Sequence, residues 1–342
     1  MITVGKTNRI GKPIDDYKGG ASTLCKGCGH DSITSSIIKA CYELGIDSHH
    51  LVKLSGIGCS SKTPAYFLKY SHGFNSLHGR MPTIATGVGM ANRKLKTIGV
   101  SGDGDTASIG MGHFVHLIRR NIPMVYIVEN NGVYGLTKGQ FSATADDGSF
   151  LKTGEINHQP PIDLCALAIQ LGCQFVARSF SGDPKQLVPM LEAAMAHDGM
   201  ALIDITSPCI TFNDHEGSTK SNKYTREHRQ PLHDLDFIPY YDETLADYKD
   251  GEKFSLKMSD GSVLKLLKLD KDYDPTNKLA ALSLLSDMEG SNTIVTGIIF
   301  KGEGKKTFQA AENMIEKPLS DLSINEIKPG TQALLDFNSG HQ

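Results

Sequence analysis

The stretch TIGVSGDGD at residues 97–105 decides the fold, because a short apolar run ends there in glycines and carboxylates. A second run, IPMVYIVENNG at residues 122–132, is rich in β-branched residues and ends in polar side chains. Both runs have the composition of buried strands. We expect a helix from about Ala107 to Arg120 between them, so that the whole segment forms one β-α-β unit.

The polar residues Asp103 and Asn131 follow these two strands and should lie close together, because ligands of open α/β sheets bind beyond the carboxyl ends of the strands. A carboxylate and an amide supply oxygens that Mg²⁺ prefers, and magnesium keeps phosphate oxygens beside them. The glycines let the backbone approach a phosphate, and the following helix offers free N–H groups. A lone Gly-Asp-Gly is most often an ordinary turn, whereas the pair of motifs predicts a magnesium diphosphate site.

The rest of the chain continues the alternation of strands and helices. This pattern is typical of an α/β fold with a mostly parallel sheet and helices on both faces. Further helices are expected over residues 31–44, with Asp31 as N-cap, and over residues 83–93, 162–171 and 184–197, with strands near residues 51, 174 and 201. Residues 134–161 interrupt the pattern, at a length typical of a functional loop.

The composition changes after Phe212. The polar segment 213–229 is expected to be a surface excursion, and the part that follows holds an apolar patch, Ile294 to Phe300, and a helix near Thr307 to Ile315. We therefore expect two domains. Residues 1–215 would carry the functional sites, and residues 216–342 would form a C-terminal extension that packs on this domain or on a partner subunit.

Four of the seven cysteines lie in loops beside expected strands and helices: Cys25, Cys28, Cys59 and Cys209. The remaining thiols fall in or beside apolar helical patterns, where cysteine is most often a small core residue, and are Cys41, Cys165 and Cys173. Four thiolates can bind zinc or an iron–sulfur cluster, and the C-x-x-C pair can also be a redox dithiol. Sequence spacing alone does not choose among these three.

The order of these motifs resembles the thiamine-diphosphate enzymes, and most closely the β subunit of the 2-oxoglutarate:ferredoxin oxidoreductases (2-oxoglutarate synthases). The resemblance runs from about residue 20 to about residue 215. Besides GDGD and ENN, it is carried by CKGCGH at 25–30, GIGCSSK at 56–62, LHGR at 77–80, YGLTKGQ at 134–140 and SPCITFN at 207–213. One departure is Ala143, where many relatives have proline.

The resemblance implies a function for individual residues of the first domain. Magnesium would be bound by Asp103, Asn131 and the carbonyl of Val133, and a [4Fe–4S] cluster by Cys25, Cys28, Cys59 and Cys209. Thiamine diphosphate would contact Ile57, Gly58, Cys59, Ser60, His78, Gly102, Gly104, Asp105, Gly135 and Leu136. Lys62, three residues after Cys59, would bind the carboxylate of the substrate.

The resemblance also implies a reaction and partners. The chain would be one subunit of an enzyme that converts 2-oxoglutarate and coenzyme A into succinyl-CoA and CO₂ while reducing ferredoxin, or that runs the reverse carboxylation. An α subunit would complete an αβ or α2β2 assembly and supply the carboxylate that activates the cofactor. Pyruvate and branched-chain 2-oxoacids stay open as substrates. The same motifs would also suit a thiamine decarboxylase or synthase without a cluster, or a non-catalytic iron–sulfur or zinc scaffold subunit.

Composition excludes other classes. A formal net charge of −3 and a pI near 6.5, without basic runs, give no reason to expect nucleic-acid binding. The N-terminus has no apolar signal segment, and no apolar run approaches the roughly 20 residues of a membrane-spanning helix. Seven thiols without an export signal favour the reducing cytoplasm.

Overall fold

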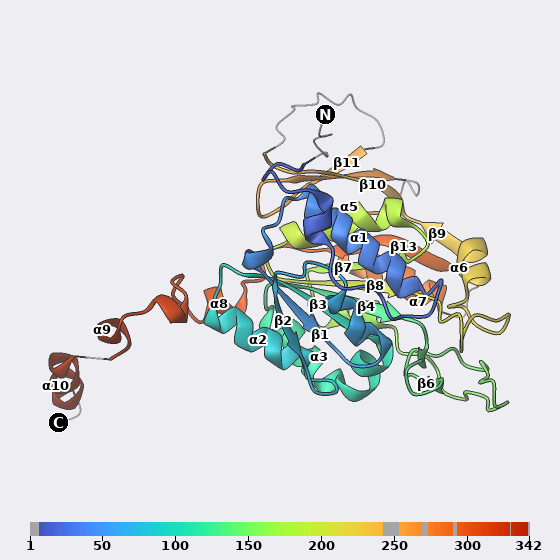
Figure 1. Cartoon of the computed structure of the whole chain (residues 1–342), viewed down its shortest axis with the longest axis horizontal. Coiled ribbons are helices and arrows are strands. Elements are labelled where there is room, and N and C mark those ends of the chain that lie inside the picture. The colour runs from blue at the N-terminus through green and yellow to red at the C-terminus, as the bar shows by residue number, and fades with distance from the viewer. Residues whose placement is uncertain (1–6, 242–252, 269–272, 290–292, 329, 341–342) are drawn as a thin grey trace.

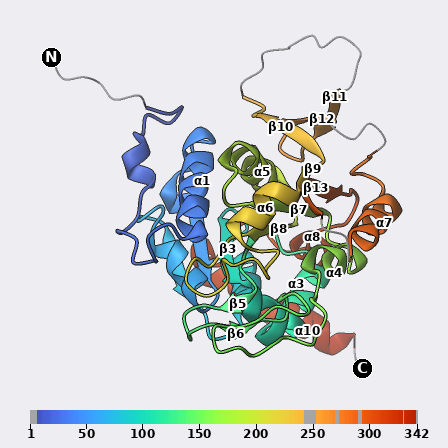
Figure 2. The same ribbon diagram turned by 90° about the vertical axis from the view of Figure 1, so that its right-hand side faces the viewer.

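A computed structural model describes residues 7–241, 253–268, 273–289, 293–328 and 330–340 of the chain. Its centre is an eight-stranded sheet in the order β2-β1-β3-β4-β8-β7-β13-β9 (Figures 1 and 2). The strands are β1 (Leu51–Ser55), β2 (His72–Asn75), β3 (Lys96–Gly102), β4 (Met124–Asn130), β7 (Phe175–Phe180), β8 (Met200–Thr206), β9 (Arg229–Pro231) and β13 (Ile294–Lys301). All neighbours pair in parallel except β13 and β7. The predicted α/β fold with a mostly parallel sheet is thus confirmed.

Helices cover both faces of this sheet because the strands are apolar on both sides. Val125 and Ile127 of β4 face the layer of α1 (Gly29–Glu43) and α5 (Pro184–Ala196), whereas Tyr126 and Val128 face the opposite layer. The opposite layer consists of α2 (Met81–Ala91), α3 (Met111–Arg120), α4 (Leu164–Gln170) and α7 (Lys278–Met288). This alternation gives the two sides of β4 different surroundings, which also determines the contacts of the polar residues at its end.

Three helix boundaries differ from the sequence-based expectation. The first helix begins at Gly29 with Cys28 as N-cap, and Asp31 instead accepts a hydrogen bond from Ser22. The helix expected from Ala107 begins at Met111, because residues 104–109 form a π-helical turn that ends where Gly110 packs against the backbone of Gly79. The helix expected over residues 307–315 is the short α8 (Phe308–Ala311).

Strands from beyond residue 216 extend the main sheet. β13 lies between β7 and β9, so the apolar patch predicted at residues 294–300 is a buried strand. A separate antiparallel sheet of β10 (His233–Ile238), β12 (Val263–Lys268) and β11 (Lys253–Lys257) packs on the α1 and α5 layer. The division at residue 216 stays a prediction.

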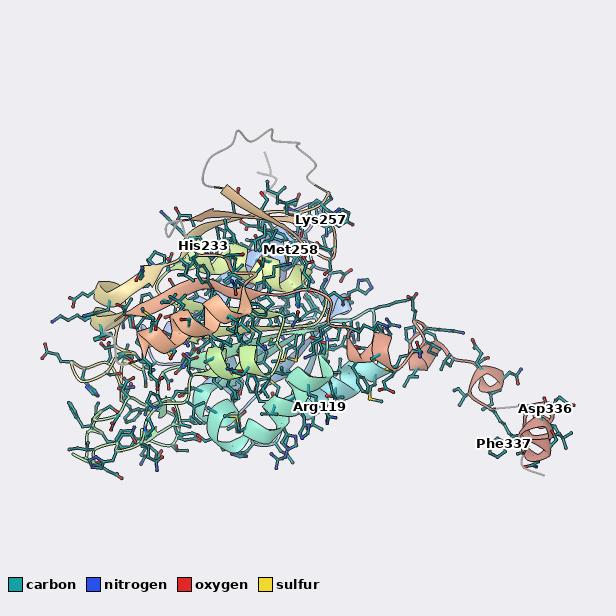
Figure 3. The ribbon with its side chains drawn as sticks, turned by 180° about the vertical axis from the view of Figure 1, so that it is seen from behind. Arg119, His233, Lys257, Met258, Asp336 and Phe337 are labelled. Carbon is teal, nitrogen blue, oxygen red and sulfur yellow. The ribbon has the colours of Figure 1, made fainter. Side chains whose placement is uncertain are left out.

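The end of the described chain forms an arm that leaves the main body (Figure 1). It carries α9 (Ile324–Ile327) and α10 (Thr331–Ser339), where Asp336 and Phe337 lie away from the sheet and its helices (Figure 3). Every residue of α10 is exposed. Among the described residues, no helix combines the length and apolar character needed to cross a membrane.

Candidate cofactor site at the carboxyl ends of β3 and β4

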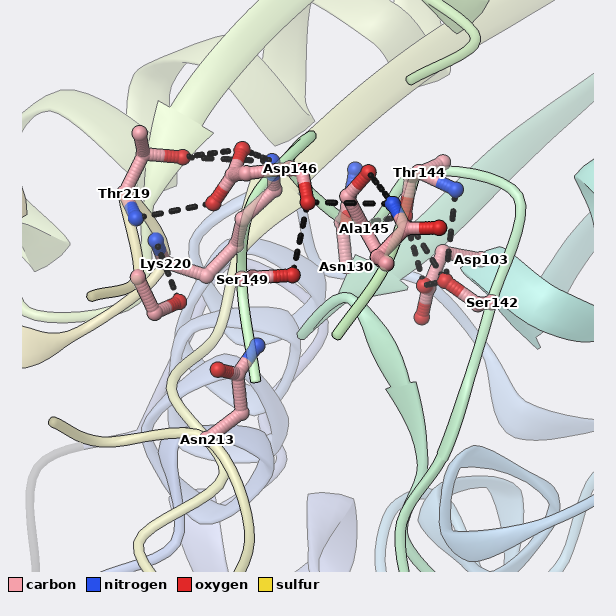
Figure 4. Close-up of polar contacts among 12 residues, drawn as sticks. Asp103, Asn130, Ser142, Thr144, Ala145, Asp146, Ser149, Asn213, Thr219 and Lys220 are labelled. Atoms are coloured by element: carbon pink, nitrogen blue, oxygen red, sulfur yellow. Dashed lines mark hydrogen bonds and ion pairs between the residues drawn. The ribbon is translucent and has the colours of Figure 1, made fainter. Parts of the chain in front are cut away.

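Asp103 lies directly after β3 and is only 1% exposed. Its carboxylate accepts hydrogen bonds from Ser142, from the Thr144 hydroxyl at 2.7 Å and from the Asn131 N–H at 3.3 Å (Figure 4). Burial raises the pKa of Asp103 above its ordinary value, although these hydrogen bonds oppose the shift. Within the described ranges no Lys or Arg forms an ion pair with Asp103, so its buried carboxylate is suited to a bound cation.

Asn131 and Val133 form a tight turn beside Asp103. The side-chain oxygen of Asn131 accepts the Val133 N–H at 3.1 Å, and the amide of Asn213 donates to the Asn131 carbonyl at 2.7 Å. Gly132 has φ +73° within this turn, a conformation that favours glycine. The structure therefore brings the three predicted magnesium residues together.

Asp105 joins two loops that carry other predicted cofactor residues. One carboxylate oxygen accepts the Ser101 hydroxyl at 2.9 Å and the Ile57 N–H at 3.3 Å, and the other accepts the Gly79 N–H at 2.7 Å. Asp105 thereby holds the loop of residues 57–60 and the loop of His78 against the end of β3. Both oxygens have partners within the protein, and direct contact of Asp105 with a diphosphate stays a prediction.

The loop of residues 134–161 is fixed by a segment that we expected to be only a surface excursion. The Asp146 carboxylate accepts a hydrogen bond from the Lys220 ammonium at 2.8 Å (Figure 4). It also accepts hydrogen bonds from the N–H and the hydroxyl of Thr219, at 2.9 and 2.8 Å. Burial alone would raise the pKa of Asp146, but Lys220 and Thr219 outweigh it and lower the pKa. Residues 213–229 therefore combine the exposed side chains expected of a surface segment with four buried polar residues, Asn213, Ser218, Ser221 and Thr225.

The four loop thiols lie close enough to influence one another, and two of them face Gly135. A Cβ atom at Gly135 would lie 3.5 Å from the sulfur of Cys209 and 3.6 Å from that of Cys59. Burial raises the pKa of Cys28 to about 12, and the charges of Cys209 and Cys59 act in the same direction. Burial also raises the pKa of Cys59, and the charge of Cys25 adds to that increase. The remaining cysteines, Cys41, Cys165 and Cys173, are buried, as predicted.

In the part of the chain that the structure describes, no three His, Cys, Asp or Glu side chains form a group that could hold one metal ion. A zinc site needs four ligands at about 2.0–2.3 Å from one centre. A cubane cluster instead spreads its four thiolates over separate irons, so it requires wider spacing.

The other predicted site residues line the surrounding loops. Gly58 has φ +84° before Cys59, and the Ser60 hydroxyl donates to the Ile57 carbonyl at 3.0 Å. Lys62 is partly buried and its charge acts on Cys59, lowering the thiol pKa against the larger effect of burial. The residues at the solvent edge are His78 and Leu136, and Gly104 lies inside against the ring of Tyr134.

Sequence reasoning assigned no function to several residues that build this site. Ser142 and Thr144 donate to Asp103, although their only sequence signal was their place in the interrupting loop. Glu129 and His30 were quoted within motifs but given no function, and both are buried beside the thiol loops. Burial raises the pKa of Glu129 well above its ordinary value and lowers the pKa of His30 to about 4, so burial disfavours charge on both.

Two protein-family models match the chain. The C-terminal TPP-binding domain of thiamine pyrophosphate enzymes matches residues 56–205, which contain the β3–β4 site. The C-terminal part of the pyruvate ferredoxin oxidoreductase β subunit matches residues 264–317. The likeness to known proteins therefore extends beyond residue 215, the limit expected from the motifs.

Curated relatives cover most of the chain. The 2-oxoglutarate oxidoreductase subunit KorB from Mycobacterium tuberculosis is 35% identical over 91% of this chain and 85% of its own length. The chain belongs to the family of 2-oxoacid:ferredoxin oxidoreductase β subunits. Another family member, the 2-oxoacid:ferredoxin oxidoreductase subunit beta from Saccharolobus solfataricus, is 46% identical, but the match spans 56% of this chain and 63% of that relative.

A solved structure of the same family supports the fold. The 2-oxoglutarate:ferredoxin oxidoreductase from Magnetococcus marinus, with 2-oxoglutarate, coenzyme A and succinyl-CoA bound, superimposes with a TM-score of 0.74 at 29% identity, covering 95% of both chains. Together with the TPP-binding-domain match, it confirms the thiamine-diphosphate-binding fold predicted from the GDGD and ENN motifs.

Proposed function

We propose that this β subunit acts in a CoA-dependent 2-oxoglutarate:ferredoxin oxidoreductase, with a thiamine diphosphate–magnesium site and a [4Fe–4S] cluster side by side. The observation that carries the proposal is the position of Gly135. It lies two residues after Val133 of the magnesium turn and faces the sulfurs of both Cys59 and Cys209. The two candidate sites are therefore neighbours, as electron transfer between them would require.

The residues present match a magnesium diphosphate. Asp103, the side chain of Asn131 and the Val133 carbonyl would ligate Mg²⁺, which prefers such oxygens. Thiamine diphosphate, when bound, supplies an electron sink for decarboxylation of a 2-oxoacid. The protein positions this site through Asp105, whose carboxylate holds the Ile57 and Gly79 backbones.

Four cysteine thiolates are a ligand set for an iron–sulfur cluster. They come from three segments, and Gly135 leaves open the space in front of two of them, Cys59 and Cys209. A [4Fe–4S] cluster, when bound, supplies one-electron transfer toward ferredoxin. The zinc scaffold and the cluster-free thiamine enzyme are the alternatives that a count of iron, sulfide and zinc distinguishes.

Lys62 is the candidate ligand for the substrate carboxylate. Its charge lowers the pKa of the Cys59 thiol, and both residues lie in the turn of residues 59–65. A relative from Methanocaldococcus jannaschii, 38% identical over 55% of this chain, is named 2-oxoglutarate synthase subunit KorB. This name and the Magnetococcus structure favour 2-oxoglutarate over pyruvate as the substrate.

An α subunit would cover the mouth of the site. Leu77 is 77% exposed beside His78, Leu136 is 52% exposed beside Gly135, and Ile109 borders Gly79. Such an apolar rim around a polar site is typical of a surface that a protein partner covers. The partner would also contribute the carboxylate that activates the cofactor.

The test is the reaction of the chain assembled with its native partner subunit. We expect CoA-dependent reduction of ferredoxin with 2-oxoglutarate at a kcat/KM at least tenfold above that with pyruvate. Lys62→Met should raise KM for the 2-oxoacid about tenfold or more, because a hydrogen bond to a charged group contributes about 1.5–3 kcal/mol. Absence of 2-oxoacid-dependent reduction in a complex that retains both cofactors would refute the proposal.

A further inference from the structure

Glu129, the next-to-last residue of β4, is a carboxyl group without exposure to solvent. The hydroxyl of Thr63 lies 3.0 Å from both of its oxygens and donates to them. Nε2 of His30 lies 3.6 Å from Oε2 of Glu129, and Nδ1 of the same ring lies 2.6 Å from the hydroxyl of Ser207. These four residues, Glu129, Thr63, His30 and Ser207, form a buried set that we call the Glu129 cluster.

The three other residues of this cluster belong to different thiol-bearing segments. The separations along the chain are short: two residues from Cys28 to His30, four from Cys59 to Thr63, and two from Ser207 to Cys209. The three segments come from α1, from the turn of residues 59–65 and from the end of β8. Glu129 thus contacts two of these segments directly, through His30 and Thr63, and reaches the third through the contact of His30 with Ser207.

The same strand end also supports the magnesium residues. The carbonyl of Asn130 accepts the Ser207 N–H at 2.8 Å. The side-chain oxygen of Asn130 lies 3.0 Å from the Thr144 hydroxyl, which also contacts Asp103. Glu129 and Asn130 point to opposite sides of β4, so one dipeptide fixes the thiol segments on one side and the Asp103 side chain on the other.

We propose that Glu129 is a positioning residue that sets the spacing of the four loop thiols and their distance from the magnesium site. The inference rests on the proposed function, since the thiols are taken as cluster ligands. Removing this carboxyl group alone leaves the buried Thr63 hydroxyl and the His30 ring without their partner, so some loss of stability is expected as well. The inference concerns a separate consequence, which should be seen at the thiols in the folded protein.

The substitutions that separate these effects are Glu129→Gln and Glu129→Leu. Gln keeps the length, an acceptor for Thr63 and a polar contact for His30, whereas Leu keeps the approximate volume and loses both contacts. A matched control is Glu192→Leu, because Glu192 is another buried acid in the α1 and α5 layer, near Glu43 at the far end of α1.

The experiment is anaerobic iron–sulfide reconstitution of the full chain with its partner, followed by iron and sulfide analysis, EPR of the reduced cluster and thermal melting. Wild type, Glu129→Gln and Glu192→Leu should bind about four iron and four sulfide with the same EPR signal. Glu129→Leu should melt at a lower temperature than wild type but be folded at the temperature of reconstitution, and it should lose at least half of its iron or show a changed EPR signal.

Wild-type iron content and an unchanged EPR signal in Glu129→Leu would overturn the inference. If that variant does not fold, Thr63→Val replaces it, since it removes only the donor to Glu129: a changed EPR signal supports the inference and an unchanged one overturns it. If wild type itself binds no iron and sulfide, the proposed function fails instead, so the two failures are distinguishable.

Discussion

Replacing Gly135 by alanine tests whether the space between two thiols is needed for a cluster. Gly135 is not among the glycines with positive φ, so its backbone accepts a side chain. The added methyl would lie 3.5 Å from the Cys209 sulfur and 3.6 Å from the Cys59 sulfur, which is ordinary van der Waals contact. The cluster-free fold should therefore not be strained, and the loss of glycine should stabilise it by about 0.4–1 kcal/mol through the unfolded state.

Cluster binding should respond in the opposite way, because the methyl fills the space that the cluster would occupy. We expect Gly135→Ala to retain less than half of the wild-type iron and sulfide. The assay combines urea unfolding of the cluster-free chain with iron and sulfide analysis after anaerobic reconstitution with the partner subunit. Gly87→Ala is the matched control, since nothing lies within 4 Å of its added methyl on α2.

Two results would refute this reasoning. Full iron and sulfide content in Gly135→Ala would mean that the cluster does not occupy the space in front of Gly135. A cluster-free Gly135→Ala chain destabilised by more than about 1 kcal/mol would mean that the site is too tight for a methyl even without a cluster, and that any loss of iron follows from strain.

Three further predictions follow from the geometry. Asp103→Ala should abolish retention of magnesium and thiamine diphosphate while leaving the cluster spectrum unchanged. Cys59→Ala should abolish the cluster spectrum while retaining magnesium and thiamine diphosphate. Loss of both cofactors from both folded variants would contradict two separate sites. His233 is 2% exposed and its Nε2 accepts the Ile298 N–H at 3.0 Å, and burial lowers its pKa to about 4. Below about pH 6.5 the unfolded chain therefore binds a proton that the folded chain does not, so this contribution to the free energy of unfolding is complete above that pH and is lost as the pH falls towards 4. His233→Gln should reduce the loss of unfolding free energy between pH 7 and pH 5 by about 2 kcal/mol. An unchanged loss in urea titrations would refute this prediction. Removal of residues 319–342 should leave the melting temperature within about 2 °C of wild type, because α9 and α10 bury no described side chain. A larger drop would show that the arm stabilises the fold.

The sequence was sufficient for the features that depend on local pattern. The apolar runs before GDGD and ENN are β3 and β4, and the rule that ligands bind at carboxyl ends of strands correctly brought Asp103 and Asn131 together. The distinction between loop and core cysteines was also correct: Cys41 and Cys165 are buried on α1 and α4, and Cys173 is buried between α4 and β7.

Features that depend on distant contacts could not be read from the sequence. The start of α3 at Met111 results from the approach of Gly110 to Gly79, two segments about 30 residues apart. β13 pairs with β7 across more than 100 residues, and no local pattern indicates its partner. The contacts of Thr219 and Lys220 with Asp146 also had no local signal, because these residues lie more than 70 positions from Asp146.

The pairing of a thiamine diphosphate site with a [4Fe–4S] cluster is best tested by a cofactor count on the chain purified anaerobically with its native partner. Iron, acid-labile sulfide, zinc, magnesium and thiamine diphosphate should be measured on one sample. We expect about four iron, four sulfide, one magnesium and one thiamine diphosphate per chain, without stoichiometric zinc. Thiamine diphosphate with zinc and no sulfide would contradict the pairing in favour of a non-redox thiamine enzyme, and absence of thiamine diphosphate would contradict the β3–β4 site itself.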